Sequence, residues 1–359
     1  MNRDIAALVR KELLDLKSYE EPSLPAGVVR LHANENPYPF PEAVREGIIA
    51  QLRELEISRY PDPAAKALRA SISTYTGWSA AQTIVGNGSN ELILTLMLTF
   101  GGPGARVVIP VPTFSMYQIV ANLTGAVPVP VSLNKDYAID MFTLEREIQH
   151  PATKLVMLCS PNNPTGNLIS PEQVAQICRS TQGLVVLDEA YYEFAQQTSV
   201  GILQDLPNLV ILRTFSKAFG LAGQRVGYLM ANEEVIAQVK KASLPYNLNA
   251  FTQIAAQVAL EQAREFSPQI EAILADRTRV DEALRKMPGL VVYPSAANFI
   301  LFKCTQKPAG EVFSLLEEAG VIIRYFHEAS GLENCLRVTI GTKEENDTFL
   351  EKLSQILSS

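Results

Sequence analysis

Residues 209–220 read LVILRTFSKAFG, an apolar run with Lys217 a few positions beyond its end. An apolar run without polar alternation predicts a strand that is covered on both faces, as strands of parallel sheets are. Ligands of such sheets bind outside the carboxyl ends of the strands, and Lys217 would lie there. An ε-amine beside other cationic groups can lose its proton and form a Schiff base with a carbonyl group. The stretch therefore predicts an α/β fold and a carbonyl-binding lysine.

Similar apolar runs recur along the chain and alternate with helical patterns. This alternation is typical of βαβ units, which build a mostly parallel sheet flanked by helices. We therefore predict a large α/β domain with seven strands, at Thr83–Val85, Arg106–Pro110, Ala126–Val131, Lys154–Cys159, Gly183–Leu187, Leu209–Leu212 and Val226–Met230.

The pattern changes after residue 231, where long helical segments, Glu233–Ser243 and Ala250–Arg285, precede shorter strands. The strands are expected at Leu290–Tyr293, Asn298–Phe302, Val321–Arg324 and Leu336–Ile340, with a helix at Pro308–Ala319. This pattern predicts a second, smaller α+β domain. We expect an N-terminal arm that packs with the small domain at residues 1–45, the large domain at 46–250 and the small domain at 251–359.

The composition is ordinary for a globular chain with a large core, because 47% of its 359 residues are hydrophobic and 19% are charged. The net charge of −7 argues against a nucleic-acid or anionic-membrane surface, since either needs a basic patch. The longest apolar stretch, Leu92–Phe100, is too short to span a bilayer, and the first residues are unlike a signal peptide. The 4 cysteines lack paired metal spacing, so we expect them to be reduced and predict no metal site. A cytoplasmic protein is expected.

Two further apolar runs end in polar motifs, SPNNPTG at residues 160–166 and DEAY at residues 188–191. Burial raises the pKa of a carboxyl such as Asp188 unless a cation lies opposite. A protonated pyridine nitrogen is such a cation, and the pair keeps the ring an electron sink. A helix N-cap or a metal ligand is the alternative, although no histidine or second aspartate is near. Asn163 and Tyr191 can donate to a ring hydroxyl oxygen, while Asn163 also suits a plain Pro-Gly turn.

The segment GNGSNE at residues 86–91 ends one predicted strand and opens a helix. Glycines allow close backbone approach, and the amides at a helix start bind phosphate. Ser89 or Asn90 can equally be an ordinary N-cap. Ser216 and Arg225 flank the lysine, and both can hold a phosphate, the arginine through its fork of donors.

A phosphate loop, an asparagine, an aspartate and a lysine at successive strand ends together predict pyridoxal 5′-phosphate as the cofactor. Lys217, Asp188 and Tyr191 are then the candidate catalytic residues. Phe114, which follows another strand, can stack on the planar ring or belong to the core.

Two arginines of the second domain are candidates for binding an anionic substrate. Arg324 and Arg337 lie at strand ends, where a lone arginine is by default paired with a surface carboxylate. In a chain without a basic surface, they are also the natural ligands for a substrate carboxylate or phosphate. The histidines, His32, His150 and His327, form no cluster, so none is predicted as a base or ligand.

Motifs along nearly the whole chain resemble those of the fold type I pyridoxal-phosphate enzymes, which are aspartate-aminotransferase-like, and within them the histidinol-phosphate aminotransferases. The matching segments are LHANENP at 31–37, RYPD at 59–62, GSNE at 88–91, NNPTG at 162–166, DEAY at 188–191, FSK at 215–217, AGQRVGY at 222–228 and RV at 337–338. The resemblance implies that Lys217 holds the cofactor and moves a proton on the substrate, and that Asp188 pairs with the ring nitrogen.

The resemblance also implies an obligate homodimer with shared active sites, in which Tyr60 reaches the phosphate of the neighbouring subunit. It implies that Asn34, Arg324 and Arg337 meet the substrate. Tyr19 stands near the place of a family tyrosine that meets the substrate phosphate, but two acidic residues follow it. Asn90 stands where many relatives have aspartate, which removes no group that the cofactor needs.

The implied reaction converts imidazole-acetol phosphate and L-glutamate into L-histidinol phosphate and 2-oxoglutarate, reversibly, in histidine biosynthesis. An aromatic amino-acid aminotransferase would share every catalytic residue, and a phosphothreonine decarboxylase would use the same fold without oxoglutarate. A non-catalytic relative should have lost Lys217 or Asp188, and both are present.

Overall fold

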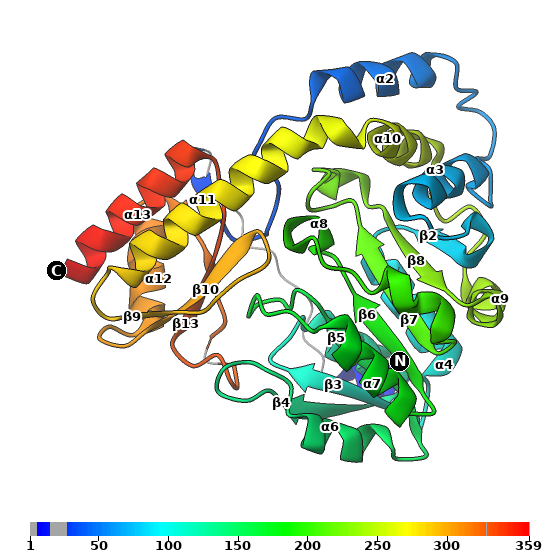
Figure 1. Ribbon diagram of the computed structural model, residues 1–359, viewed down its shortest axis with the longest axis horizontal. Helices are drawn as coiled ribbons and strands as arrows, with labels where there is room; N and C mark the ends of the chain where they lie inside the picture. Colours follow the sequence, from blue (N-terminus) through cyan, green and yellow to red (C-terminus); the bar gives the residue numbers. More distant parts are fainter. Residues whose placement is uncertain (1–5, 15–26, 328, 359) are drawn as a thin grey trace, which may run out of the picture.

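The computed structural model describes residues 6–14, 27–327 and 329–358. Its main element is a 7-stranded sheet in the order β2-β8-β7-β6-β5-β3-β4 (Figure 1). The strands are β2 (Thr83–Gly86), β3 (Arg106–Val111), β4 (Val127–Ser132), β5 (Thr153–Cys159), β6 (Leu184–Asp188), β7 (Leu209–Thr214) and β8 (Gly227–Ala231). Strand β8 is antiparallel to both of its neighbours, and the other adjoining pairs are parallel. The predicted α/β fold with a mostly parallel sheet is confirmed.

Helices cover both faces of this sheet, which explains why its strands lack polar alternation. In β7, Leu209 and Ile211 enter the core on one face, and Val210 and Leu212 enter the core on the other. Each such side chain contributes about 1.5 to 3 kcal/mol through burial. The first face packs against α3 (Lys66–Thr76), α6 (Met141–Ile148), α7 (Pro171–Ser180) and α10 (Ala250–Glu261), and the second against α4 (Ser89–Phe100), α5 (Met116–Thr124) and α9 (Glu233–Ala242).

A smaller 4-stranded antiparallel sheet, ordered β12-β13-β10-β9, lies to the left of the large sheet in Figure 1. Its strands are β9 (Leu290–Val292), β10 (Phe299–Cys304), β12 (Arg324–Tyr325) and β13 (Cys335–Thr339). Three helices share its core, α11 (Ser267–Arg285), α12 (Ala309–Glu318) and α13 (Lys343–Ser358). This is the expected smaller α+β unit.

The N-terminal segment is attached to the smaller unit. Strand β1 (Val29–Arg30) pairs in parallel with β11 (Val321–Ile322), and the Leu31 amide donates to the Ile322 carbonyl at 2.7 Å. The chain then crosses to α2 (Glu42–Arg53), which packs on α10 of the large unit. This crossing brings residues 32–36 between the two sheets, close to the site described below.

The predicted domain boundaries stay a prediction, but core packing bears on one of them. Ala256, Val258 and Ala259 of α10 lie in the core of the large sheet, although the sequence assigned residues from 251 onward to the small domain. Helix α10 is apolar enough to bury one face against either unit. Its contacts with α2 and α3 show that it packs on the large unit.

Two elements differ from the sequence expectation. The helical segment Ala250–Arg285 is two helices, separated by η5 (Ala263–Phe266), because Pro268 suits the first turn of α11 but would remove a hydrogen bond inside one long helix. The predicted strand Val321–Arg324 is two strands, since β11 pairs with β1 whereas β12 pairs with β13.

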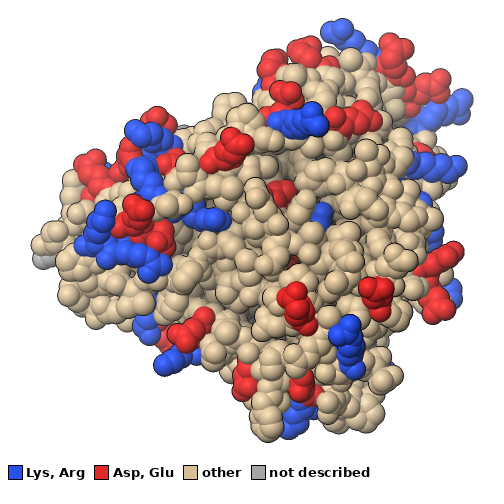
Figure 2. All heavy atoms as spheres, viewed as in Figure 1, with Lys and Arg blue, Asp and Glu red and all other residues tan. Residues whose placement is uncertain are grey.

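The remaining elements are short: η1 (Ala6–Leu8), α1 (Lys11–Leu14), η2 (Ala80–Gln82), α8 (Tyr192–Ala195), η3 (Val200–Asp205) and η4 (Ala222–Gln224). All four cysteines are buried thiols. Among the described residues, no helix is long and apolar enough to cross a bilayer, and no group of three acidic, histidine or cysteine side chains could hold a metal ion. Figure 2 shows acidic and basic side chains mixed along the margins of one face, around a centre with few charges.

Candidate active site

The predicted motifs meet where β5, β6 and β7 end, because these strands are neighbours in the large sheet. Cys159 at the end of β5 lies opposite Asp188 at the end of β6, which lies opposite Leu212 of β7. The turn after β5 carries Asn163, and the turn after β7 carries Lys217. The structure therefore brings the predicted asparagine, aspartate and lysine to one edge of the sheet.

Asp188 is a buried carboxylate at the centre of this edge, with 3% of its surface exposed. Its Oδ2 accepts a hydrogen bond from the Tyr117 hydroxyl at 2.8 Å, and its Oδ1 accepts one from the Ala190 amide at 3.0 Å. Burial raises the pKa of Asp188 to about 6, although both hydrogen bonds oppose the rise and the Lys217 ammonium opposes it least. A cation placed against this carboxylate would stabilise its ionised form.

Lys217 is a buried amine whose chemistry is set by its surroundings. Burial, followed by the positive charge of Arg337 and then that of Arg225, lowers the pKa of Lys217 to about 8. Its Nζ donates a hydrogen bond to the Ala33 carbonyl at 2.9 Å. Because a substantial fraction of the amine is neutral near pH 8, Lys217 is suited to attack a carbonyl carbon.

Tyr191 and Asn34 form a hydrogen-bonded pair beside the lysine. The Tyr191 hydroxyl accepts a hydrogen bond from Asn34 Nδ2 at 2.9 Å, which leaves the hydroxyl proton for another acceptor. Burial raises the pKa of Tyr191, so that it remains a donor at neutral pH. Asn34 has a left-handed backbone, φ 55°, and is held by Thr339 of the small sheet, whose Oγ1 accepts from the Asn34 amide at 3.0 Å.

Arg337 is the buried cation of the site. One guanidinium nitrogen donates to Asn163 Oδ1, and the other terminal nitrogen donates to the His32 carbonyl at 2.6 Å. Its Nε is buried without a hydrogen-bond partner in the described part of the chain. Burial lowers the pKa of Arg337 to about 10, and no described carboxylate opposes the shift. A buried cation with neutral partners and a spare donor is suited to an anionic substrate group.

Arg324 and His32 lie beside Arg337. Arg324 is exposed and directly opposite Arg337 in the β12–β13 pair, so it belongs to the rim of the site. His32 is half-buried, and its Nδ1 has no hydrogen-bond partner among the described residues. Burial lowers the pKa of His32, with the arginines Arg30, Arg324 and Arg337 acting in the same direction. The sequence did not predict His32 as a site residue, because a lone histidine gives no indication that it lies in the site.

The residues expected to bind phosphate surround the start of α4. Ser89 is the first residue of that helix, Asn90 is the second, and Arg225 Nη1 lies 3.4 Å from Ser216 Oγ. A Cβ added at Gly88 would lie 2.7 Å from Arg225 Nη2, so the guanidinium lies directly against this turn. Helix amides, hydroxyls and a guanidinium therefore face one another, as a phosphate site requires.

Phe114 lies two residues before α5 begins, and Tyr117 is the second residue of that helix. Their ring centroids are 5.6 Å apart in an edge-on arrangement, with Phe114 half-buried and Tyr117 fully buried. Tyr117, the hydrogen-bond donor to Asp188, was missed from the sequence. Its spacing from Phe114 is the signal that could have found it.

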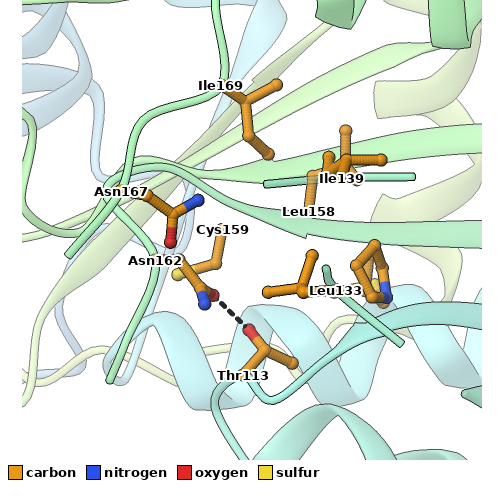
Figure 3. A pocket seen from close by; sticks show the side chains of 10 residues that line it. Thr113, Leu133, Ile139, Leu158, Cys159, Asn162, Asn167 and Ile169 are labelled. Carbon is orange, nitrogen blue, oxygen red and sulfur yellow. Dashed lines mark hydrogen bonds between the residues drawn. The ribbon is translucent and has the colours of Figure 1, made fainter. Parts of the chain in front are cut away.

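The turns after β3 and β5 are tied together by Asn162. Thr113 donates to Asn162 Oδ1 at 2.6 Å (Figure 3). Asn162 Nδ2 donates to the Pro112 carbonyl at 2.9 Å. These bonds fix Phe114 relative to Asn163. Thr113 and Asn162 also line the pocket shown in Figure 3, which measures about 10 Å³ and has room for a single water at most, not for a substrate.

One described residue among those predicted, Tyr60, lies apart from this cluster. Tyr60 is 81% exposed and stacks on Tyr246 with ring centroids 4.6 Å apart, and no hydrogen bond of the described chain joins it to the phosphate-binding residues. Tyr19 lies outside the described residues.

The site fits pyridoxal phosphate on three counts. A buried carboxylate at the end of β6 suits a protonated ring nitrogen, and an amine with a lowered pKa suits the aldehyde. The start of α4 leaves room only for glycine at Gly227, where an added Cβ would lie 2.7 Å from the Ser89 amide nitrogen that a phosphate would need.

Comparisons with known proteins agree with this geometry. Residues 26–353 match the family described as aminotransferase class I and II. The chain is 40% identical over 355 residues to the histidinol-phosphate aminotransferase of Thermoanaerobacter pseudethanolicus, covering 98% of this chain and 99% of that protein. It is 37% identical over 353 residues to the protein of the same name from Aquifex aeolicus, covering 98% and 99%.

Solved structures show the same relationship. The histidinol-phosphate aminotransferase from Clostridium acetobutylicum superposes with a TM-score of 0.85 at 26% identity, covering 92% of this chain and 99% of that one. The enzyme of that name from Sinorhizobium meliloti, solved in complex with pyridoxal-5′-phosphate, also has a TM-score of 0.85 at 26% identity, covering 92% and 91%. The chain therefore belongs to the pyridoxal-phosphate-dependent aminotransferases of class I and II and, within them, to the histidinol-phosphate aminotransferase family.

Proposed function

We propose that this chain transfers an amino group between L-glutamate and imidazole-acetol phosphate, forming L-histidinol phosphate and 2-oxoglutarate, as a step of histidine biosynthesis in the cytoplasm. The observation that carries the proposal is the 40% identity with a histidinol-phosphate aminotransferase over 98% of the chain. The buried Arg337, which has a spare donor, supports it, because both amino-group partners carry anionic groups.

Pyridoxal phosphate, when bound, supplies a ring that stabilises negative charge at the substrate carbon. In the proposal, Lys217 Nζ would hold the cofactor and would also carry a proton to and from the substrate carbon that bears the amino group. Asp188 keeps the ring nitrogen protonated through its carboxylate. The lowered pKa of Lys217, about 8, supports both roles, because a nucleophilic amine and a base must each lose a proton near the working pH.

Three further side chains would hold the ring. The amide oxygen of Asn163 accepts a hydrogen bond from Arg337, so the NH₂ group of Asn163 can donate to the ring oxygen. Tyr191 accepts from Asn34 and can donate its own proton to the same oxygen. Phe114 would stack on the ring face, since it lies half-buried beside Tyr117, the partner of Asp188.

The phosphate of the cofactor would be bound by Ser89, Asn90, Ser216 and Arg225 and by Tyr60 of a second copy of the chain. The exposure of Tyr60 supports a homodimer with shared sites, because a tyrosine of the same chain would have to point inward. Ile57, Leu244 and Tyr246 are also exposed apolar side chains, and Tyr246 stacks on Tyr60. An exposed aromatic pair such as Tyr60 and Tyr246 on a globular chain supports an interface there.

The substrate would lie between Asn34, Arg337 and Arg324. Arg337 would bind its anionic group as a planar fork, with Arg324 at the rim able to reach a more distant phosphate or carboxylate. Tyr19 is proposed as a further phosphate ligand from the sequence resemblance alone.

A competition among amino donors tests the proposal. Purified enzyme with added cofactor and 2-oxoglutarate is given histidinol phosphate, phenylalanine or phosphothreonine, and glutamate and carbon dioxide are both measured. The proposal expects a kcat/KM for histidinol phosphate at least tenfold above that for phenylalanine, and no carbon dioxide from phosphothreonine. A preference for phenylalanine would indicate an aromatic amino-acid aminotransferase, and carbon dioxide release would indicate a decarboxylase.

A further inference from the structure

We propose that Tyr117 is a positioning residue for the cofactor, whose hydroxyl keeps the Asp188 carboxylate ionised and directed at the cofactor's ring nitrogen. The inference rests on the proposed pairing of that nitrogen with Asp188. It adds a residue of helix α5 to a site built mainly from strand ends and the turns that follow them.

The contact joins two elements that are far apart in sequence. The Tyr117 hydroxyl, on α5, donates to Asp188 Oδ2 at 2.8 Å, and both residues are buried. The other oxygen, Oδ1, is held by the Ala190 amide. With one donor on each oxygen, the carboxylate cannot rotate about its bond to Cβ without losing a hydrogen bond inside the core, where the loss costs most.

These donors leave free lone pairs for a third partner. Each carboxylate oxygen accepts about two hydrogen bonds, and each oxygen of Asp188 accepts one from the described residues. A ring N–H is the partner that the site lacks, and the two existing donors define the direction from which it can approach. Tyr117 thus restricts the carboxylate to a single orientation.

The hydroxyl also acts on the charge of Asp188. Of the influences that oppose the burial of this carboxyl, the hydrogen bond from Tyr117 is the largest, so removing it would raise the pKa of Asp188 further above about 6. A protonated Asp188 cannot stabilise a positive ring nitrogen. A phenylalanine at position 117 would fill the same space, which confines the role to the hydroxyl and separates it from core packing.

The test replaces Tyr117 with phenylalanine and measures cofactor binding to the cofactor-free enzyme. Two ligands are compared: pyridoxal phosphate, and its carbocyclic analogue in which CH replaces the ring nitrogen. We expect Tyr117→Phe to weaken pyridoxal phosphate binding roughly tenfold and to leave binding of the analogue within about twofold of the unmodified enzyme. The pH midpoint of the bound cofactor's visible absorption should rise, because a less protonated ring withdraws fewer electrons from the bound nitrogen.

The matched control is Tyr228→Phe. Tyr228, on β8, is as deeply buried as Tyr117, and its hydroxyl makes no hydrogen bond to Asp188. This variant should bind both ligands as the unmodified enzyme does. Equal weakening of both ligands by Tyr117→Phe, or an unchanged affinity and absorption midpoint, would overturn the proposal. Neither result depends on which amino donor the enzyme prefers, so the substrate assignment is tested separately.

Discussion

At the scale of single residues, the proposed chemistry depends on two buried groups, Lys217 and Asp188. Each has a pKa shifted from its usual value in the direction that favours its neutral form. Lys217 has a pKa lowered to about 8, and Asp188 has a pKa raised to about 6. Both shifts follow first from burial, which disfavours a charge of either sign. Each shift gives a measurable pH dependence.

For Lys217, the reaction of the cofactor-free enzyme with pyridoxal phosphate should accelerate with rising pH. The neutral amine is the nucleophile, and its fraction increases until the pH passes the lowered pKa of about 8. Stopped-flow absorbance between pH 6.5 and 9.5, roughly centred on that pKa, should therefore show a rate that levels off above its midpoint. Lys217→Ala is the control and should show no such phase. A rate that still climbs steeply at the upper end of the range would contradict the lowered pKa.

For Asp188, ionisation should destabilise the cofactor-free protein. The folded-state pKa of about 6 exceeds the usual value of 3.8, so the unfolded chain loses this proton first as the pH rises. The resulting loss of stability begins near the unfolded pKa and is complete above the folded one, reaching about 3 kcal/mol. Asp188→Asn avoids it. Urea unfolding of the two cofactor-free proteins measures this effect at pH 8 and pH 5, which lie about one unit or more on either side of the folded pKa. The free energy of unfolding of Asp188→Asn should exceed that of the unmodified protein by a larger margin at pH 8 than at pH 5.

Addition of pyridoxal phosphate should reverse that order, because only the unmodified carboxylate stabilises the ring nitrogen. A stability difference that does not grow with pH in the cofactor-free proteins would show that Asp188 is not the titrating group.

The sequence predicted Asn163, Asp188 and Lys217 at the site, because these residues lie at or just after the ends of neighbouring strands, which meet at one edge. It did not predict Tyr117 or His32. In the sequence, Tyr117 cannot be distinguished from a tyrosine on the apolar face of a helix. Only the structure shows that its hydroxyl lies 2.8 Å from Asp188 Oδ2. His32 enters the site because the N-terminal segment crosses between the sheets, which depends on the pairing of β1 with β11.

At the scale of elements, the ends of β6 and β7 are joined by a buried ion pair. Arg213 Nη2 and Nε donate to Glu189 Oε2 at 2.8 and 3.0 Å, and both side chains are 2% exposed. Glu189 follows Asp188, and Arg213 precedes Lys217 on the neighbouring strand. The pair therefore fixes the two strand ends that carry the catalytic groups.

Breaking this pair should be costly. Arg213→Met leaves a carboxylate buried without its cation, and we expect a loss of about 3 to 5 kcal/mol in the free energy of unfolding. The matched control is Arg279→Met, because the Arg279 side chain, which pairs with Asp276 and Asp347, is itself more than a third exposed. That change should cost less than about 1 kcal/mol. Similar losses in the two variants, measured by urea denaturation, would refute the stabilising role of the Arg213–Glu189 pair.

Strands and helices were predictable to different degrees. The strands of the large sheet could be recognised because burial on both faces leaves uninterrupted apolar runs. The break at η5 and the division of Val321–Arg324 into β11 and β12 could not, since both depend on contacts with distant segments. Helix α10 belongs to the large core for the same reason.

At the scale of the whole molecule, the proposed homodimer can be tested by complementation. Lys217→Ala and Tyr60→Ala chains are each purified, then mixed under conditions that exchange subunits. A hybrid dimer would contain one site with a native Lys217 from one chain and a native Tyr60 from the other. Random exchange should restore up to roughly a quarter of the activity of the unmodified enzyme. Activity that stays at the sum of the two separate variants would place Tyr60 outside the partner's site.

The central claim is that the strand ends form a cofactor site in which Lys217 carries pyridoxal phosphate, and one chemical measurement tests it most directly. The purified enzyme, loaded with the cofactor, is reduced with borohydride and digested, and the peptides are mapped by mass spectrometry. We expect a single modified peptide with the cofactor fixed on Lys217, and no modified peptide from Lys217→Ala. A cofactor fixed on any other lysine, or one that persists in the variant, would contradict it.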